Sequence, residues 1–281
     1  MYIKTNDNIN LYVNREGEGL DCIYVHGGPG AWSKDFEKFC GIHMNDMFNI
    51  TYLDQRGCGR SEGEYNSNYS IDRLVEDIEE VRVKLNIQKF IIIAHSFGGI
   101  IATSYASKYG ENLEGIILIN CTLDFKEALK SQIKEGCNLL GVDQIDCDTN
   151  LQNLICIWKK VVYNLVRYNM YYGLQFKSIS NYEKLENLDK EILNTKMSEL
   201  AFENKNYFLD YTYLTKNINI PTLIITGSED YAVGIEHHES FEFKNSIIKT
   251  INGRHTPYIE DSSKLINIIK GFVSVFIQNG Y

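Results

Sequence analysis

The sequence predicts an α/β fold with a mostly parallel central sheet, helices on both faces and an inserted helical cap. Three observations predict it. Short apolar runs alternate with stretches of helical periodicity through about the first 120 residues, a pattern that calls for parallel strands joined by right-handed crossovers. This alternation fails from about residue 122 and resumes at Pro221. A serine, an aspartate and a histidine each follow an apolar run, so they are expected at strand ends.

The elements follow from local patterns along the chain. The apolar runs predict strands at residues 9–13, 21–25, 49–53, 90–93, 115–119, 222–227 and 247–251. Ser70 is a suitable N-cap for a helix whose apolar residues recur with a 3.6-residue period up to Leu85. A further helix is expected at 99–109, and a terminal helix with one apolar stripe at 265–277.

The break in the alternation predicts the domain organisation. Residues 1–121 and 214–281 are expected to form one catalytic core, and residues 122–213 a helical cap inserted into it. The middle segment is rich in aromatic residues. These side chains either line a substrate pocket or form the core of the cap, and the second role is the commoner one for any single aromatic residue.

Composition excludes several classes of protein. The net charge of -9 argues against nucleic acid as a partner, because proteins that bind the phosphate backbone usually carry a basic face. No apolar stretch is long enough to predict a membrane span, and the N-terminus lacks the pattern of a signal peptide. The 7 cysteines include no Cys-x-x-Cys pair, which is typical of a reduced cytoplasmic protein. No dinucleotide fingerprint, phosphate loop or metal-ligand spacing is present, so neither a cofactor nor a metal is expected.

Ser96 is the predicted nucleophile. It follows the apolar run 90–93 and lies in Ala-His-Ser-Phe-Gly-Gly, where a strand must turn into a helix almost at once. Small residues two positions before and after the serine prevent clashes in such a turn. Gly98 fills the second of these positions, whereas Ala94 departs from the usual glycine by one methyl group.

A serine hydroxyl needs an imidazole to take its proton, and the imidazole needs a carboxylate to fix its tautomer. His255 lies in a loop after the predicted strand 247–251, and Asp230 in a loop after 222–227. Asp124 and Glu229 are alternatives for the carboxylate, since each also follows an apolar run. The order serine, acid, histidine is the order of the α/β-hydrolase fold.

The run His-Gly-Gly-Pro-Gly at 26–30 directly follows a predicted strand. Glycine allows the backbone to approach a reacting group closely. We therefore expect the N–H groups of Gly28 and Phe97 to form the oxyanion hole.

With these residues in view, the chain resembles the prolyl iminopeptidase branch of the α/β-hydrolase superfamily. The resemblance rests on His-Gly-Gly-Pro-Gly at 26–30 and Asp-Gln-Arg-Gly-Cys-Gly-Arg-Ser at 54–61, together with the serine turn, Asp230 and His255. It spans most of the core but little of the cap. It implies that Asp54 and Arg56 brace the oxyanion loop rather than take part in the chemistry.

The resemblance also implies a substrate class. Aminopeptidases of this branch hold the free amino group of the substrate with acidic residues near the cap. The segment 201–208 is similar to the cap segment of the family that contains a Glu and a Tyr-Phe pair, with a spacing that differs by one residue. Glu203 is therefore a candidate amine binder, although a surface carboxylate on a helix is an equally good interpretation.

Together these features predict a serine hydrolase that acts on small acyl substrates through Ser96, His255, Asp230 and an acyl-enzyme. The expected substrates are small molecules or short peptides with a free N-terminal residue. Two alternatives stay open: a carboxylesterase or lactonase on small esters, and a non-catalytic ligand-binding protein with the same fold.

Overall fold

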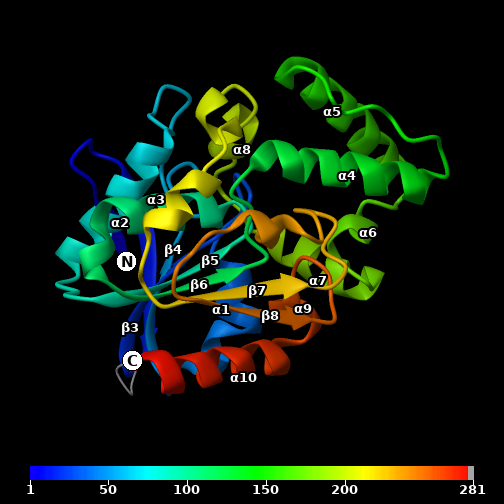
Figure 1. Cartoon of the computed structure of the whole chain (residues 1–281). Helices are drawn as coiled ribbons and strands as arrows, with labels where there is room; N and C mark the ends of the chain where they lie inside the picture. The colour runs from blue at the N-terminus through cyan, green and yellow to red at the C-terminus, as the bar shows by residue number, and fades with distance from the viewer. Residues whose placement is uncertain (278–281) are drawn as a thin grey trace.

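A computed structural model describes residues 1–277. Its centre is an eight-stranded sheet with the order β1-β2-β4-β3-β5-β6-β7-β8 (Figure 1). The strands are β1 (Tyr2–Lys4), β2 (Asn10–Gly17), β3 (Leu20–Val25), β4 (Phe48–Leu53), β5 (Phe90–His95), β6 (Leu113–Ile119), β7 (Thr222–Gly227) and β8 (Ser246–Ile251).

The six strands β4, β3, β5, β6, β7 and β8 pair in the parallel sense, whereas β1 pairs with β2 and β2 pairs with β4 in the antiparallel sense. The predicted mostly parallel sheet is thereby confirmed. The short edge strand β1 was not expected from the sequence, because its three residues are too few for a period to show. Neither was the position of β4 between β2 and β3, since the order of strands in a sheet is not a local property.

Helices cover both faces of the sheet. In Figure 1, α2 and α3 lie on one side of the strands and the C-terminal α10 on the other. Ser70 caps α2 as predicted, with its hydroxyl accepting from Arg73 N–H at 3.3 Å. The core helices are α1 (Lys34–Phe39), α2 (Ile71–Lys84), α3 (Gly98–Tyr109), α9 (Pro257–Glu260) and α10 (Ser262–Phe272), which a π-helical turn at Val273–Ile277 extends.

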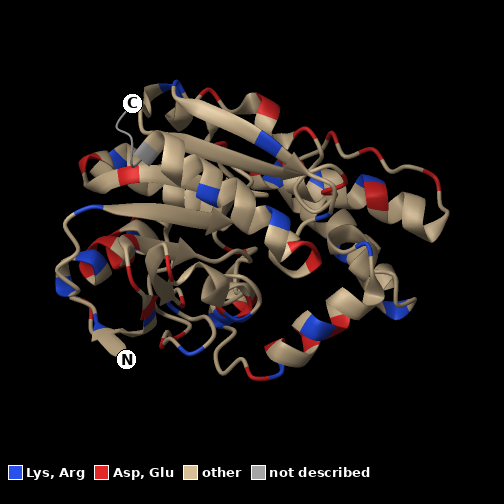
Figure 2. Ribbon diagram, turned by 90° about the horizontal axis from the view of Figure 1, so that it is seen from below, with Lys and Arg blue, Asp and Glu red and all other residues tan. Residues whose placement is uncertain are grey.

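Successive residues of the central strands enter two different hydrophobic cores. Ile92 and Ala94 pack in the core with α2 and α3, whereas Ile91 and Ile93 pack in the core with α1 and α10. This explains why β5 is apolar without alternation: both of its faces are covered. Charged residues lie mainly on the helices and loops, and β5 and β7 contain none (Figure 2).

Helices α4–α8 occupy the region predicted to be a cap, and β7 resumes the sheet. Figure 1 shows α4 and α5 side by side beyond the carboxyl end of the sheet. The last four residues of the predicted core range, 278–281, lie outside the described residues. The helices of this region are α4 (Phe125–Leu140), α5 (Leu151–Arg167), α6 (Tyr172–Gln175), α7 (Ile179–Asp189) and α8 (Lys196–Leu200).

Between residues 1 and 277, none of the helices combines the length and the apolar character that crossing a membrane requires. The 7 cysteines are all free thiols, and five of them are buried.

The loop after β4 is held by a buried arginine. The Arg56 side chain is fully buried, and its Nε and Nη2 donate to the two oxygens of Asp77 on α2 at 2.6 and 2.8 Å. Its Nη1 and Nη2 also donate to Asp7 in the loop after β1. Arg56 therefore joins three segments that are distant in the sequence, which supports the structural role that the resemblance implies for it.

Replacing Arg56 with methionine is expected to lower the free energy of unfolding by about 3–5 kcal/mol, because the buried carboxylate of Asp77 would keep only Arg73 as a charged partner and the ion pair with Asp7 would be lost. Urea unfolding measures this loss. Arg167→Met is the control: Arg167 is exposed, and its loss should change the free energy of unfolding by about 0.5 kcal/mol or less. Equal effects of the two substitutions would contradict the structural role of Arg56.

Candidate active site

Ser96 lies in a sharp turn between β5 and α3. Its φ of 55° falls in the left-handed region, which is rare for a residue with a side chain. Its N–H donates to Ile119 O on β6 at 3.2 Å, and its carbonyl accepts from Gly99 and Thr122, so the strained turn is held from several sides. A Cβ at Gly98 would lie 2.5 Å from Val25 O, which explains why the turn requires glycine there.

Three predicted site residues meet at this turn. The Nε2 of His255 lies 2.9 Å from the Ser96 hydroxyl, and its Nδ1 lies 3.0 and 3.1 Å from the two carboxylate oxygens of Asp230. All three side chains are buried. Asp230 also accepts from the N–H groups of Ala232 and Val233, so its carboxylate is fixed by the loop after β7.

The glycine-rich loop after β3 lies against Ser96. A Cβ at Gly27 would lie only 2.7 Å from the Cβ of Ser96, so no larger residue fits between loop and serine. Among residues 1–277, the N–H groups of Gly28 and Phe97 have no protein acceptor. The predicted oxyanion hole requires two such donors without a protein partner.

The loop after β4 supports this glycine-rich loop. Gln55 N–H donates to Nε2 of the buried His26 at 2.9 Å, and the Gln55 side chain donates to His26 O at 2.7 Å. Burial lowers the pKa of His26 to about 4, so its imidazole is neutral and Nδ1 can donate to Gly27 O. Asp54 accepts from Ser33 and Arg60 in the same region. Asp54 and Gln55 thus hold the loop in place, and Gln55 was not singled out from the sequence.

A cavity of about 370 Å³ is lined by Ser96 and by residues of the segment 122–213 that the sequence predicts to be a cap. Its polar wall includes Gly28, Ser96 and His255, and its apolar wall comes largely from the cap. No lysine or arginine is among the residues that line it. The cap residues that contribute are Phe125, Ala128, Leu129, Gln132, Trp158, Tyr171, Gln175, Leu185, Asp189, Ser198, Ala201 and Phe202.

Two carboxyl groups that the sequence did not single out line this cavity. Asp35 on α1 is buried, and burial raises its pKa to about 7. Asp189, at the end of α7 in the cap, accepts from Trp32 Nε1 at 2.9 Å, and burial raises its pKa to about 6. The position of Asp35 shortly after the glycine-rich loop could have drawn attention to it, whereas no local pattern marks Asp189.

The structure does not bring Glu203 to the cavity. Glu203 is exposed and lines a separate surface depression together with Tyr65, Tyr69 and Asn204. The residues around it turn their aromatic side chains inward instead: Tyr207 and Phe208 are buried.

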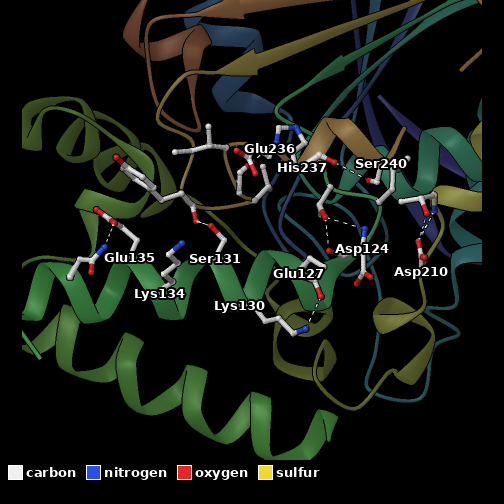
Figure 3. Close-up of a pocket in the computed structure, with 18 residues that line it drawn as sticks. Asp124, Glu127, Lys130, Ser131, Lys134, Glu135, Asp210, Glu236, His237 and Ser240 are labelled. Carbon is white, nitrogen blue, oxygen red and sulfur yellow. Dashed lines mark hydrogen bonds and ion pairs between the residues drawn. The ribbon is translucent and has the colours of Figure 1, made fainter. Parts of the chain in front are cut away.

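Asp124, the alternative carboxylate, also lies elsewhere. It caps the N-terminus of α4, where its side chain accepts from Lys126 N–H at 2.9 Å. Figure 3 shows it in a second cavity of about 840 Å³, between α4 and the loop after β7. The carboxylate that contacts His255 is therefore Asp230. Asp124 caps α4 instead, and Glu229 pairs with Lys177.

The comparisons with known proteins agree with this fold. A family model described as "alpha/beta hydrolase fold" matches residues 23–135. A proline iminopeptidase of Saccharolobus solfataricus is 25% identical over 94% of this chain and 89% of its own length. A proline iminopeptidase of Neisseria gonorrhoeae is 34% identical, but over only 42% of this chain and 38% of its own length.

A solved structure of a proline iminopeptidase-related protein from Thermus thermophilus superposes with a TM-score of 0.80 at 22% identity, covering 99% of this chain and 98% of that one. At that identity the superposition shows the fold alone. The chain therefore has the α/β-hydrolase fold and is similar to proteins of the proline iminopeptidase branch of that superfamily.

Proposed function

We propose that this protein is a serine hydrolase that works through an acyl-enzyme. The observation that supports the proposal most is the chain of hydrogen bonds from Ser96 Oγ to His255 Nε2 at 2.9 Å and from His255 Nδ1 to Asp230 at 3.0 Å. In this arrangement His255 accepts the hydroxyl proton as Ser96 attacks, and Asp230 stabilises the imidazolium that forms.

The remaining steps follow from the same groups. The oxyanion of the tetrahedral intermediate accepts from the N–H groups of Gly28 and Phe97. His255 then donates its proton to the leaving amine or alcohol, which departs. A water molecule, activated by His255, attacks the acyl-enzyme and releases the acid. No cofactor is needed for any of these steps.

For the substrate, we propose short peptides or amides with a free N-terminal amine, as for an aminopeptidase of the prolyl iminopeptidase type. The cavity carries the carboxyl groups of Asp35 and Asp189 and no lysine or arginine, so it favours a cationic ligand. Its volume of about 370 Å³ suits a small substrate. The relatives named proline iminopeptidases support the same substrate class.

A panel of chromogenic substrates tests the proposal. Proline, alanine and leucine arylamides are compared with their N-acetylated counterparts and with short-chain esters. We expect turnover of the free-amine arylamides and much slower turnover of the acetylated ones. Turnover of esters alone would instead favour a carboxylesterase or lactonase. No turnover and no labelling by a fluorophosphonate would favour a non-catalytic ligand-binding protein.

Asp189→Asn is expected to raise KM for the free-amine arylamides by about tenfold or more, because the substrate ammonium would lose its charged partner. KM for esters without an amine should change little. Glu203→Gln is the matched control: it removes a cap carboxylate outside the cavity and should leave KM unchanged. A larger effect from Glu203→Gln than from Asp189→Asn would contradict the assignment.

The same carboxylate predicts a pH dependence. Burial raises the pKa of Asp189 to about 6, so the group is ionised above that pH and protonated below it. KM of the wild-type protein for free-amine substrates is therefore expected to rise as the pH falls through about 6. In Asp189→Asn the part of this rise centred near pH 6 should be lost, whereas the contribution of Asp35, whose pKa burial raises to about 7, should remain. Steady-state kinetics between pH 5 and pH 8 would measure the difference, because a group titrates within about one to two pH units of its pKa.

A further inference from the structure

The backbone carbonyl of His255 accepts a hydrogen bond from the side chain of another histidine, His95. Nε2 of His95 lies 2.9 Å from His255 O, and the two imidazole rings lie 4.6 Å apart at an angle of 45°. His95 is buried and directly precedes Ser96. Its side chain does not take part in the proton transfers proposed above.

The rest of the His255 backbone is also held. Asn120 Nδ2, at the end of β6, donates to the same carbonyl at 3.0 Å, and His255 N–H donates to Gln175 O in the cap at 3.0 Å. The His255 backbone is thus fixed by the ends of two strands on one side and by the cap on the other.

The chemistry of a carbonyl fixes the tautomer of His95. A carbonyl oxygen only accepts, so Nε2 of His95 must carry the hydrogen, and Nδ1 of the neutral ring is an acceptor. Nδ1 faces the Tyr258 hydroxyl at 3.4 Å, and that hydroxyl lies 2.8 Å from Asp35 Oδ2. Burial and the neighbouring His255 hold the pKa of His95 well below its usual range. A neutral His95 beside His255 does not oppose the charge that His255 gains when it accepts a proton.

We propose that His95 is a positioning residue for His255: its Nε2–H ties the loop that carries the base to the same end of β5 that carries Ser96. Residues 95 and 96 then contact His255 together, one at its carbonyl and one at its imidazole. This shared attachment keeps the 2.9 Å distance between Ser96 Oγ and His255 Nε2. Tyr258 supports the His95 ring through its edge-on contact at 5.0 Å and through its hydroxyl, which lies 3.4 Å from Nδ1. The inference rests on the proposed serine hydrolase function.

Two substitutions of His95 separate positioning from packing. His95→Leu removes the donor, whereas His95→Gln keeps an N–H that can reach the His255 carbonyl. We expect His95→Leu to lower kcat by about 10²-fold with KM nearly unchanged, because a small displacement of the base affects the chemical step more than substrate binding. His95→Gln should restore most of the loss. Equal kcat in His95→Leu and wild type, or an equal loss in both variants, would overturn the inference.

If His95→Leu does not fold, Tyr258→Phe tests whether His95 positions His255. It keeps the ring against His95 and removes only the hydroxyl, so kcat should fall severalfold, with KM unchanged for esters without an amine. Wild-type kcat would overturn the inference. Tyr105→Phe is the matched control, because its buried hydroxyl also donates to a carboxylate, that of Glu79 at 2.7 Å, away from His255. It should keep wild-type kcat. If the wild-type protein turns over none of the substrates in the panel, the proposed function fails, and this inference fails with it.

Discussion

Ser96→Ala is expected to reduce kcat by about 10⁶-fold, since no other hydroxyl lies within hydrogen-bond distance of His255 Nε2 among the described residues. Alanine keeps the Cβ, so the strained turn at φ 55° is changed as little as possible and the protein should stay folded. Labelling by a fluorophosphonate should be lost completely. The rate of substrate turnover and the rate of fluorophosphonate labelling can be measured on the same protein preparations.

Ser104→Ala is the control for this experiment. Ser104 lies on α3, close to Ser96 in sequence, and its hydroxyl has no hydrogen-bond partner among residues 1–277. The Ser104 variant should be labelled and should turn over substrate like the wild type. Equal labelling of Ser96→Ala and wild type would refute Ser96 as the nucleophile.

Asp230→Asn is expected to lower kcat by about 10⁴-fold. The amide is nearly the same size as the carboxylate, but it cannot stabilise the imidazolium, and its NH₂ group favours the wrong tautomer of His255. KM should change much less than kcat, because Asp230 is not among the residues that line the cavity. Steady-state kinetics on one ester and one arylamide would measure both constants.

Asp124→Asn is the matched control for Asp230→Asn. Asparagine caps a helix about as well as aspartate, so α4 should keep its start and the fold its stability. Wild-type kcat is expected for this variant, since Asp124 lies in the second cavity (Figure 3). A large loss in Asp124→Asn with wild-type kcat in Asp230→Asn would exchange the roles of the two aspartates.

Local patterns predicted the strands and helices of the core well. The strand predicted at 21–25 is β3 at Leu20–Val25, and the helix predicted from Ser70 is α2 at Ile71–Lys84. These elements depend on periods of two to four residues, which a sequence displays directly. The edge strand β1 and the place of β4 depend on pairing between distant segments, which a local pattern does not contain.

In the site, too, some residues could be predicted from a local pattern and others depend on contacts between distant segments. Ser96 could be singled out because a strand that turns at once into a helix needs small residues at fixed positions around it. The choice between Asp230 and Asp124 could not be made locally, because both follow parallel strands that end at the same edge of the sheet. The path of the loop after β7 brings Asp230 to His255, whereas Asp124 is used to cap α4.

The cap was the least predictable part. The resemblance drew attention to Glu203, but the structure lines the cavity with Asp189 from the cap and Asp35 from the core. Which carboxyl group reaches a cavity depends on how separate helices pack on the core, and a short matching segment with altered spacing does not determine that packing.

By itself, then, the sequence determined the fold class, the core elements and the turn that holds Ser96, because each follows from the backbone preferences of neighbouring residues. The tertiary structure alone decided which carboxylate meets His255, which acids line the cavity, and that His95 contacts the backbone of His255. These are contacts between residues far apart in the chain, and their geometry is fixed only when the sheet order and the cap packing are fixed.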